Sequence, residues 1–298
     1  MSELLQAADL VRVGLAGSVR DYVLHTHRDT RLRLQAIDYG GQPAGYVAQP
    51  GEVVNYVENH DNQTLFDTNA MKLPAGTSTE DRARVQILGA ALVAFSQGIA
   101  YYHAGIDLLR SKSLDRNSFD SGDWFNRLDW SAQASAFGSG LPPRQDNASS
   151  WPVMRPLLAD AAIRPAPAQI AWTRAAFRDL LRIRNSSTLF RLRTARDIRE
   201  RLSFHNTGPA QVPTMIAARL DGEGYPGAAF AEIVYLVNVD KAAAGVTIAP
   251  AAGKEFRLHP VHVSPQAADT SIAAVAAFDA ATGRFFVPAR SAVVFVRS

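Results

Sequence analysis

The stretch VVNYVENHDNQTLFD, residues 53–67, joins an apolar and β-branched run to a cluster of His, Asp and Asn side chains. The run at 53–57 is typical of a buried parallel strand. Polar side chains at the end of such a strand are costly to bury unless they line a cavity. His60, Asp61 and Asn62 are therefore candidate site residues, although a single His near a strand end more often has a structural role.

The residues that follow predict a helix and a second strand. Thr77 and Ser78 are each followed three positions later by an acidic residue, which gives two overlapping helix N-cap signals. Gly98 is a natural helix terminator, and residues 99–102 form the next predicted strand. Apolar residues at spacings of three and four make one face of the helix, namely Val85, Leu88, Leu92 and Phe95.

Residues 53–103 therefore predict a βαβ unit. Its two parallel strands would end on the same side, which is the ligand-binding side of an α/β barrel or open sheet. The cluster at 60–62 and His103 would both lie there. We expect a structural role for His103.

The rest of the chain divides into four regions. The first fifty residues are predicted to be irregular, and a second helix is predicted at 168–185. Residues 104–168 show no convincing periodicity, but their Asp, Arg, Asn, Trp and Phe content favours a functional loop over a linker. Short strand-like runs separated by turn residues follow residue 196 and suggest an antiparallel β-sandwich that folds alone.

Composition excludes several classes of protein. The chain has 31 basic and 28 acidic residues and no cysteine, so disulfides, zinc ribbons and thiol catalysis are excluded. The arginines of residues 174–201 alternate with apolar residues, which favours a solvated helix face over an anion-binding or nucleic-acid surface. No apolar run is long enough for a membrane span, and this chain shows no signal peptide, so its compartment stays unassigned.

Two other kinds of site do not fit the cluster at 60–62. A metal site would need further ligands, and no H-x-x-x-H pattern or cluster of acidic residues is present. A serine triad would need a G-x-S-x-G elbow, which is absent. Binding of sugar hydroxyl groups by imidazole, carboxylate and amide groups remains open.

Two long segments carry a family resemblance. YVENHDNQTLFD (56–67) resembles the fourth signature region of the α-amylase superfamily, in the variant found in pullulanases and limit dextrinases. DRARVQILGAALVAFSQGIAYYHAGIDLLRSKSLDRNSFDSGDWFNRLDW (81–130) is similar to bacterial type I pullulanases. Weaker similarity at 10–24, 36–41, 177–192 and 233–241 extends the resemblance over essentially the whole chain.

The resemblance implies a fold and an activity. The fold class would be α/β plus all-β, with the C-terminal portion of a (β/α)8 barrel followed by an antiparallel β-sandwich. The partial barrel would occupy residues 1–193 and the sandwich residues 196–298. The activity would be retaining hydrolysis of α-1,6-glucosidic branch linkages in α-glucans, namely pullulan, limit dextrin and amylopectin. Calcium is common in such enzymes, but no ligands or other cofactors can be assigned here.

The resemblance also implies roles for individual residues. Asp61 matches the carboxylate that stabilises the transition state, and His60 matches its partner. Asn62 is expected to contact the substrate. In the loop, Asp115, Arg116 and Trp124 are candidate substrate contacts, Trp124 by stacking on a sugar ring. For these three residues, internal structure of the loop is an equal alternative.

The family's other two catalytic carboxylates are missing from this sequence. A retaining glycosidase needs a nucleophile and an acid/base about 5 Å apart, and the G-F-R-F-D-type and G-E-G-W-type motifs that carry them do not occur in residues 1–298. We therefore expect the chain alone to be inactive and to need the missing N-terminal part of the same enzyme as its partner. The alternatives are a non-catalytic glucan-binding fragment and a gene fragment without independent function.

Overall fold

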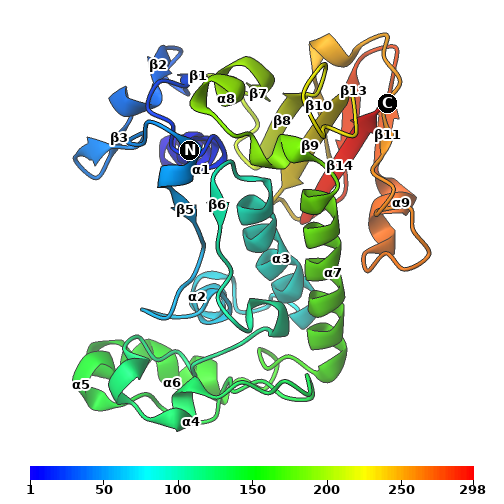
Figure 1. Ribbon diagram of the computed structural model, residues 1–298. Coiled ribbons are helices and arrows are strands. Elements are labelled where there is room, and N and C mark those ends of the chain that lie inside the picture. The colour runs from blue at the N-terminus through cyan, green and yellow to red at the C-terminus, as the bar shows by residue number, and fades with distance from the viewer. The chain divides into compact units, whose positions relative to one another are not determined.

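The predicted strand–helix–strand unit is present in the structure, a computed structural model that describes all residues from 1 to 298 (Figure 1). Strand β5 (Val54–Asn55) is parallel to β6 (Ile99–Ala100). Between them lie α2 (Leu65–Lys72) and α3 (Thr79–Phe95). The strands are shorter than predicted. Ser78 is the residue that accepts the capping hydrogen bond, from the Asp81 amide at 3.1 Å.

Gly98 makes the turn from α3 into β6 possible. Its φ of +97° is left-handed, and a Cβ atom at this position would lie 2.7 Å from Cγ1 of Val53. Only glycine fits such a position without strain. The adjacent Gln97 carbonyl accepts a hydrogen bond from Asn55 at 2.7 Å, so the turn is tied directly to β5.

Contacts divide the chain into two units, each assembled from separate stretches. Unit 1 comprises Met1–Asn55, Ala91–Tyr101 and Asp179–Ser298, and unit 2 comprises Tyr56–Ala90 and Tyr102–Arg178. The predicted boundary at 193–196 concerns the domains of the family and stays a prediction. None of the helices has the length and hydrophobicity of a membrane span.

The prediction that the first fifty residues are irregular was wrong. Unit 1 begins with α1 (Ser2–Leu15), and two small antiparallel hairpins follow. The hairpin strands are β1 (Val23–His25), β2 (Arg31–Arg33), β3 (Asp38–Tyr39) and β4 (Gln42–Pro43). The apolar pattern of α1 is hidden because its buried face includes the charged residues Asp9 and Arg12.

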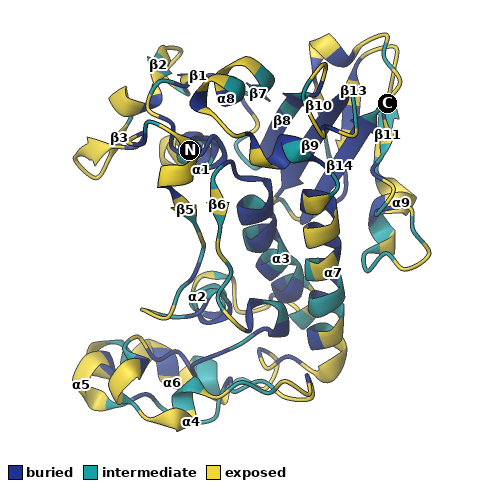
Figure 2. Ribbon diagram, in the orientation of Figure 1, coloured by how far each residue is buried: buried dark blue, intermediate teal, exposed yellow.

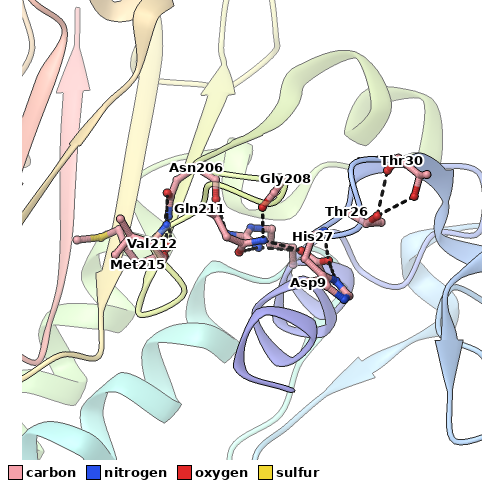
Figure 3. A network of polar contacts seen from close by, with 10 residues as sticks. Asp9, Thr26, His27, Thr30, Asn206, Gly208, Gln211, Val212 and Met215 are labelled. Atoms are coloured by element: carbon pink, nitrogen blue, oxygen red, sulfur yellow. Dashed lines mark hydrogen bonds and ion pairs between the residues drawn. The ribbon is translucent and has the colours of Figure 1, made fainter. Parts of the chain in front are cut away.

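A polar network explains how these two charges are buried. Arg12 donates hydrogen bonds to Asp9 Oδ1 at 3.1 Å and to Gln211 Oε1 at 2.7 Å. His27 contacts Asp9 Oδ2 with both its backbone amide and Nδ1, at 2.8 and 2.7 Å. Figure 3 shows that Gln211 reaches Asp9 from a loop of the β-rich region. Residues 196–298 are thus bonded to α1, which argues against the expectation that they fold alone.

The region after residue 196 is antiparallel, as predicted, and forms two sheets. The five-stranded sheet has the order β11-β14-β9-β8-β7, and the three-stranded sheet has the order β10-β13-β12. Their strands are β7 (Leu202–His205), β8 (Met215–Asp221), β9 (Glu232–Asn238), β10 (Ala244–Thr247), β11 (Arg257–Leu258), β12 (Ala277–Asp279), β13 (Arg284–Val287) and β14 (Ser291–Arg297). The helices α8 (Ala195–Arg201) and α9 (Thr270–Val275) and the strand β12 were not predicted.

Both sheets contribute to one hydrophobic core in unit 1. Val234 and Phe295 come from the five-stranded sheet, whereas Phe285 and Val287 come from the three-stranded sheet. Strand β9 is buried along its whole length (Figure 2). The strand-like runs RFFVPA and SAVVFVRS thus predicted β13 and β14 correctly, because apolar side chains of both strands share this core.

Unit 2 has a core of its own, so residues 104–168 are not a linker. Phe66, Leu109, Phe137 and Met154 belong to one buried cluster. Residues 104–168 contain three short α-helices, α4 (Asp123–Asn126), α5 (Arg144–Asn147) and α6 (Trp151–Ala159). The predicted helix α7 (Pro167–Asn185) follows them. Two of these helices have four residues each, too few to show a helical period, and α6 contains Pro156.

Candidate functional site

The His-Asp-Asn cluster lies in the loop between β5 and α2. Thr64 ends the loop as the N-cap of α2, and its hydroxyl accepts a hydrogen bond from the Asp67 amide at 3.1 Å. The side chains of His60 and Asp61 are 81% and 69% exposed, and His60 Nδ1 lies 3.4 Å from Asp61 Oδ1. Both functional groups therefore point to solvent from a loop that is fixed at its end.

Buried charged residues hold the loop in place. The Glu58 carboxylate accepts a hydrogen bond from the Leu65 amide, which joins the two ends of the loop. The Lys112 ammonium donates to the His60 carbonyl at 3.1 Å. Both side chains are buried, and burial lowers the pKa of Lys112. These buried hydrogen bonds fix the backbone of the loop, which keeps His60 and Asp61 oriented.

The carboxyl group of Asp67 belongs to the same group of buried polar residues. It accepts hydrogen bonds from the Ser111 hydroxyl and from the Lys112 amide, the latter at 2.7 Å. Its complete burial raises the pKa of Asp67 to about 6, although these hydrogen bonds act in the opposite direction.

A cleft of about 440 Å³ lies beside the motif. Its lining residues are Asp61, Asn62, Arg116, Asn117 and Asp146. With His60 beside Asp61, the structure thus brings together four of the six predicted site residues. Asn117 donates to Asp146 at 2.8 Å, so two residues that we did not predict form one wall. The cleft offers carboxylate, amide and guanidinium groups, a mixture that can hydrogen-bond a polyhydroxylated ligand.

The other predicted residues lie elsewhere. Asp115 is fully buried, and its Oδ1 accepts hydrogen bonds from the Asn117 amide and the Asn147 side chain at 3.1 and 3.0 Å. Its surroundings favour the alternative of internal loop structure. Trp124 is half-exposed, with its indole nitrogen bonded to the Ser139 carbonyl and the Arg127 guanidinium 4.4 Å from its ring centre.

His103 lies in a buried polar group, in line with the structural role that we expected. Its Nδ1 is 3.6 Å from Glu58 Oε1, and its Nε2 is 3.2 Å from the Arg110 guanidinium. Glu58 stands within the quoted motif and Asn117 directly after Arg116, so adjacency could have flagged both. Asp146 carried no such signal, because it reaches the cleft from a separate short helix. No group of three or more His, Asp or Glu residues could hold a metal ion.

Proteins with similar sequences include several pullulanases. "Pullulanase 1, chloroplastic" of Arabidopsis thaliana is 40% identical over 303 residues, covering 99% of this chain and 31% of the relative. The pullulanase of Klebsiella pneumoniae is 35% identical over 289 residues, covering 96% of this chain and 26% of the relative. The chain thus spans less than a third of the length of these relatives.

Solved structures agree. Ligand-free PulA from Klebsiella pneumoniae has a TM-score of 0.90 at 33% identity over 99% of this chain and 28% of PulA. The maltotriose complex of PulA has a TM-score of 0.89 at 33% identity over 98% of this chain and 31% of PulA. The family described as "Alpha-1,6-glucosidases, pullulanase-type, C-terminal" matches residues 132–298.

These matches identify the class of protein, because the matched proteins are glycoside hydrolases that act on α-1,6 linkages. The chain belongs to the pullulanase-type α-1,6-glucosidase family, and its fold is that of the C-terminal part of bacterial pullulanases.

Proposed function

We propose that this chain provides the transition-state-stabilising part of an active site that hydrolyses α-1,6 branch linkages in α-glucans. The observation that carries the proposal is the cleft at Asp61, which combines Asp61, Asn62 and Arg116 in a member of the pullulanase family. Pullulan, limit dextrin and amylopectin are the substrates that we expect. The maltotriose bound by the related PulA supports an α-glucan ligand.

Asp61 and His60 are the residues that act on the sugar at the cleaved bond in this proposal. The Asp61 carboxylate accepts hydrogen bonds from ring hydroxyls and favours a distorted, oxocarbenium-like ring. His60 contacts the same sugar, and its contribution grows as charge develops in the transition state. Because Lys112 and Glu58 fix the loop, these groups need little reorganisation when substrate binds.

We infer further that β5 and β6 are the seventh and eighth strands of a (β/α)8 barrel. Their register partners Val54 and Ile99 are each 49% exposed, although both are large apolar residues. Apolar side chains exposed in pairs on a parallel sheet favour coverage by further structure. In the same interpretation, residues 1–193 belong to the barrel domain and residues 196–298 form a β-sandwich.

The isolated chain is expected to release no reducing ends from pullulan. Asp61 is neither nucleophile nor acid/base in the proposed mechanism, so the covalent step needs two carboxylates from outside residues 1–298. A reducing-sugar assay on the purified chain tests this expectation. Activity that persists after rigorous purification, and disappears with Asp61→Asn, would contradict it. Activity that appears only on adding an N-terminal part with the two missing motifs would support it.

Glucan binding can be tested separately from cleavage. NMR titration of the chain with maltotriose should shift signals of the cleft residues, and Asp61→Asn should weaken binding about tenfold because a charge-assisted hydrogen bond is lost. Asp120→Asn is the matched control, since Asp120 is an exposed carboxylate of unit 2 outside the cleft. Equal binding by the two variants would argue against a substrate role for Asp61. Trp124→Ala tests the predicted stacking in the same assay.

A further inference from the structure

In the arginine-rich segment at 174–201, Arg199 differs from its neighbours because it lines a cleft. Five of the segment's nine arginines contact protein groups through their side chains. Arg182 pairs with Asp179 at 3.2 Å, and Arg196 pairs with Glu200 at 2.7 Å. Arg201 donates to the carbonyls of Asp221 and Glu223. Arg199, on the same short helix α8, makes no hydrogen bond or ion pair and instead lines a cleft of about 320 Å³.

This cleft lies between the β1–β2 hairpin, α8 and β7, which are neighbours at the upper left of Figure 1. Its polar lining residues are Asp21, His25, Arg31, Arg199, Ser203 and Thr207. All of them belong to unit 1, whereas the cleft at Asp61 belongs to unit 2. The arginine cleft is therefore a separate site.

Charge in the arginine cleft is unbalanced. Arg31 and Arg199 line it from β2 and α8, and neither guanidinium group has a hydrogen bond or ion pair with the protein. The two carboxylates near the cleft each lie beside another basic side chain. Asp29 is 2.9 Å from His25 Nε2, and Asp21 is 4.0 Å from Arg33. The lining thus holds two arginines and one carboxylate, that of Asp21, and this excess of positive charge favours a bound anion.

Addition of a peptide strand is a poorer explanation of the same cleft. Strand β7 is an edge strand, and an exposed edge can pair with an extended peptide. Here, however, the Tyr22 hydroxyl donates to the Leu202 carbonyl at 3.1 Å and so occupies a backbone group of that edge. The ring of Tyr22 also packs against Phe204 with centroids 5.8 Å apart, which closes the edge further.

We propose that the arginine cleft binds a phosphate group, either as free phosphate or as a phosphate monoester. Two guanidinium groups and the Thr207 hydroxyl offer several donors in one lining, which suits the several oxygens of phosphate better than the two of a carboxylate. A neutral sugar would leave both guanidinium charges without a partner. The volume of about 320 Å³ leaves room for a small esterified group beside the phosphate.

The test is a titration of the full chain with inorganic phosphate at constant ionic strength, followed by NMR and by the unfolding temperature. We expect saturable shifts at residues of β1 and β7. Arg31→Gln and Arg199→Gln should each weaken binding about tenfold, because each removes a charge-assisted contact. Arg31→Lys and Arg199→Lys should retain more affinity than the Gln variants and show that the fold is intact.

The controls are chosen from the same elements. Arg28→Gln lies in the turn between β1 and β2 and Arg196→Gln on α8, and neither residue lines the cleft. Both controls should bind phosphate like the unmodified chain. Absence of saturable binding, binding by the Arg31→Gln or Arg199→Gln variant as tight as by the unmodified chain, or acetate binding as tight as phosphate would overturn the proposal. Glucose 6-phosphate compared with phosphate and glucose distinguishes the sources, since tighter binding of the ester identifies a monoester and weaker binding identifies free phosphate.

Discussion

Asp67 shows how one enclosed acid makes unit 2 respond to pH. Its side chain is fully buried, and burial raises its pKa from 3.8 to about 6. Between these values the folded state holds a proton that the unfolded chain has released. Stability from this group is therefore complete below pH 3.8 and falls as pH rises through 6, by about 3 kcal/mol.

Asp67→Asn should remove this pH dependence. The Asn side chain has one accepting oxygen where the carboxyl group has two, so one of the hydrogen bonds from Ser111 and Lys112 is lost and the variant is expected to be less stable at pH 4 by about 1–3 kcal/mol. Between pH 4 and pH 7 that difference should shrink by about 3 kcal/mol, because only the unmodified chain must release the buried proton. Denaturant unfolding at both pH values measures it, and a difference that does not change with pH would refute the assignment.

For single residues, residue type and adjacency were enough to predict where the cluster lies, while its role stays a prediction. The exposed cluster at 60–62 follows a strand and belongs to a distinctive motif, so it could be located. Whether Asp115 faces substrate or the interior could not be decided, because its partner Asn147 is separated from it by 32 positions. Lys112 likewise gave no signal, since a buried lysine is recognisable only once its partner, here the His60 carbonyl, is known.

Glu232 joins several elements of the five-stranded sheet. It stands at the start of β9, and its carboxylate contacts Arg219 of β8, Arg297 of β14 and Lys254. Burial alone would raise the pKa of Glu232, but these three cations outweigh it and lower the pKa to about 2. The stability from this group is thus present above pH 4.5 and is lost as pH falls toward 2.

Glu232→Ala should destabilise the chain by about 3 kcal/mol, since it leaves buried or half-buried cations without a counter-charge. Glu200→Ala provides the control, because Glu200 forms an exposed pair with Arg196 and should contribute less than about 1 kcal/mol. Chemical denaturation at pH 7 compares the two variants. Similar losses would mean that Glu232 is not the organising charge of the sheet.

Elements that carry an apolar period were predictable and the others were not. Strand β9 and helix α7 were found because their apolar patterns are long. Helix α1 was missed because a charged pair replaces apolar residues on its buried face. The short helices α4 and α5 have too few residues for any period to show.

For the whole molecule, the decisive contacts are those that tie α1 to residues 206–211. Arg12 is completely buried and donates to the Asn206 carbonyl at 2.7 Å as well as to Gln211. Arg12→Met should lower the stability of unit 1 by about 3 kcal/mol, because Asp9 would stay buried with only His27 left as an ion-pair partner. Residues 196–298 alone should accordingly be unstable.

Hydrogen exchange can localise the effect. All four tryptophans lie in unit 2, so their fluorescence reports on that unit, whereas amide exchange in β8 and β9 reports on unit 1. Arg12→Met should accelerate exchange in those strands more than it shifts the tryptophan transition. Arg20→Met, a change at an exposed arginine, is the control. Unaltered exchange in β8 and β9 would show that the α1 network does not stabilise the sheet.

The same network has a consequence during synthesis on the ribosome. Arg12 and Gln211 are 199 positions apart, so at about 5–20 residues per second α1 waits about 10–40 seconds for its partner to be made. Every residue of unit 2 is translated in that interval and can fold first. A nascent helix with Asp9 and Arg12 on its docking face stays hydrated while it waits, whereas an apolar face would be a target for aggregation or chaperone capture. The charges that conceal α1 in the sequence would thus protect the unfinished chain.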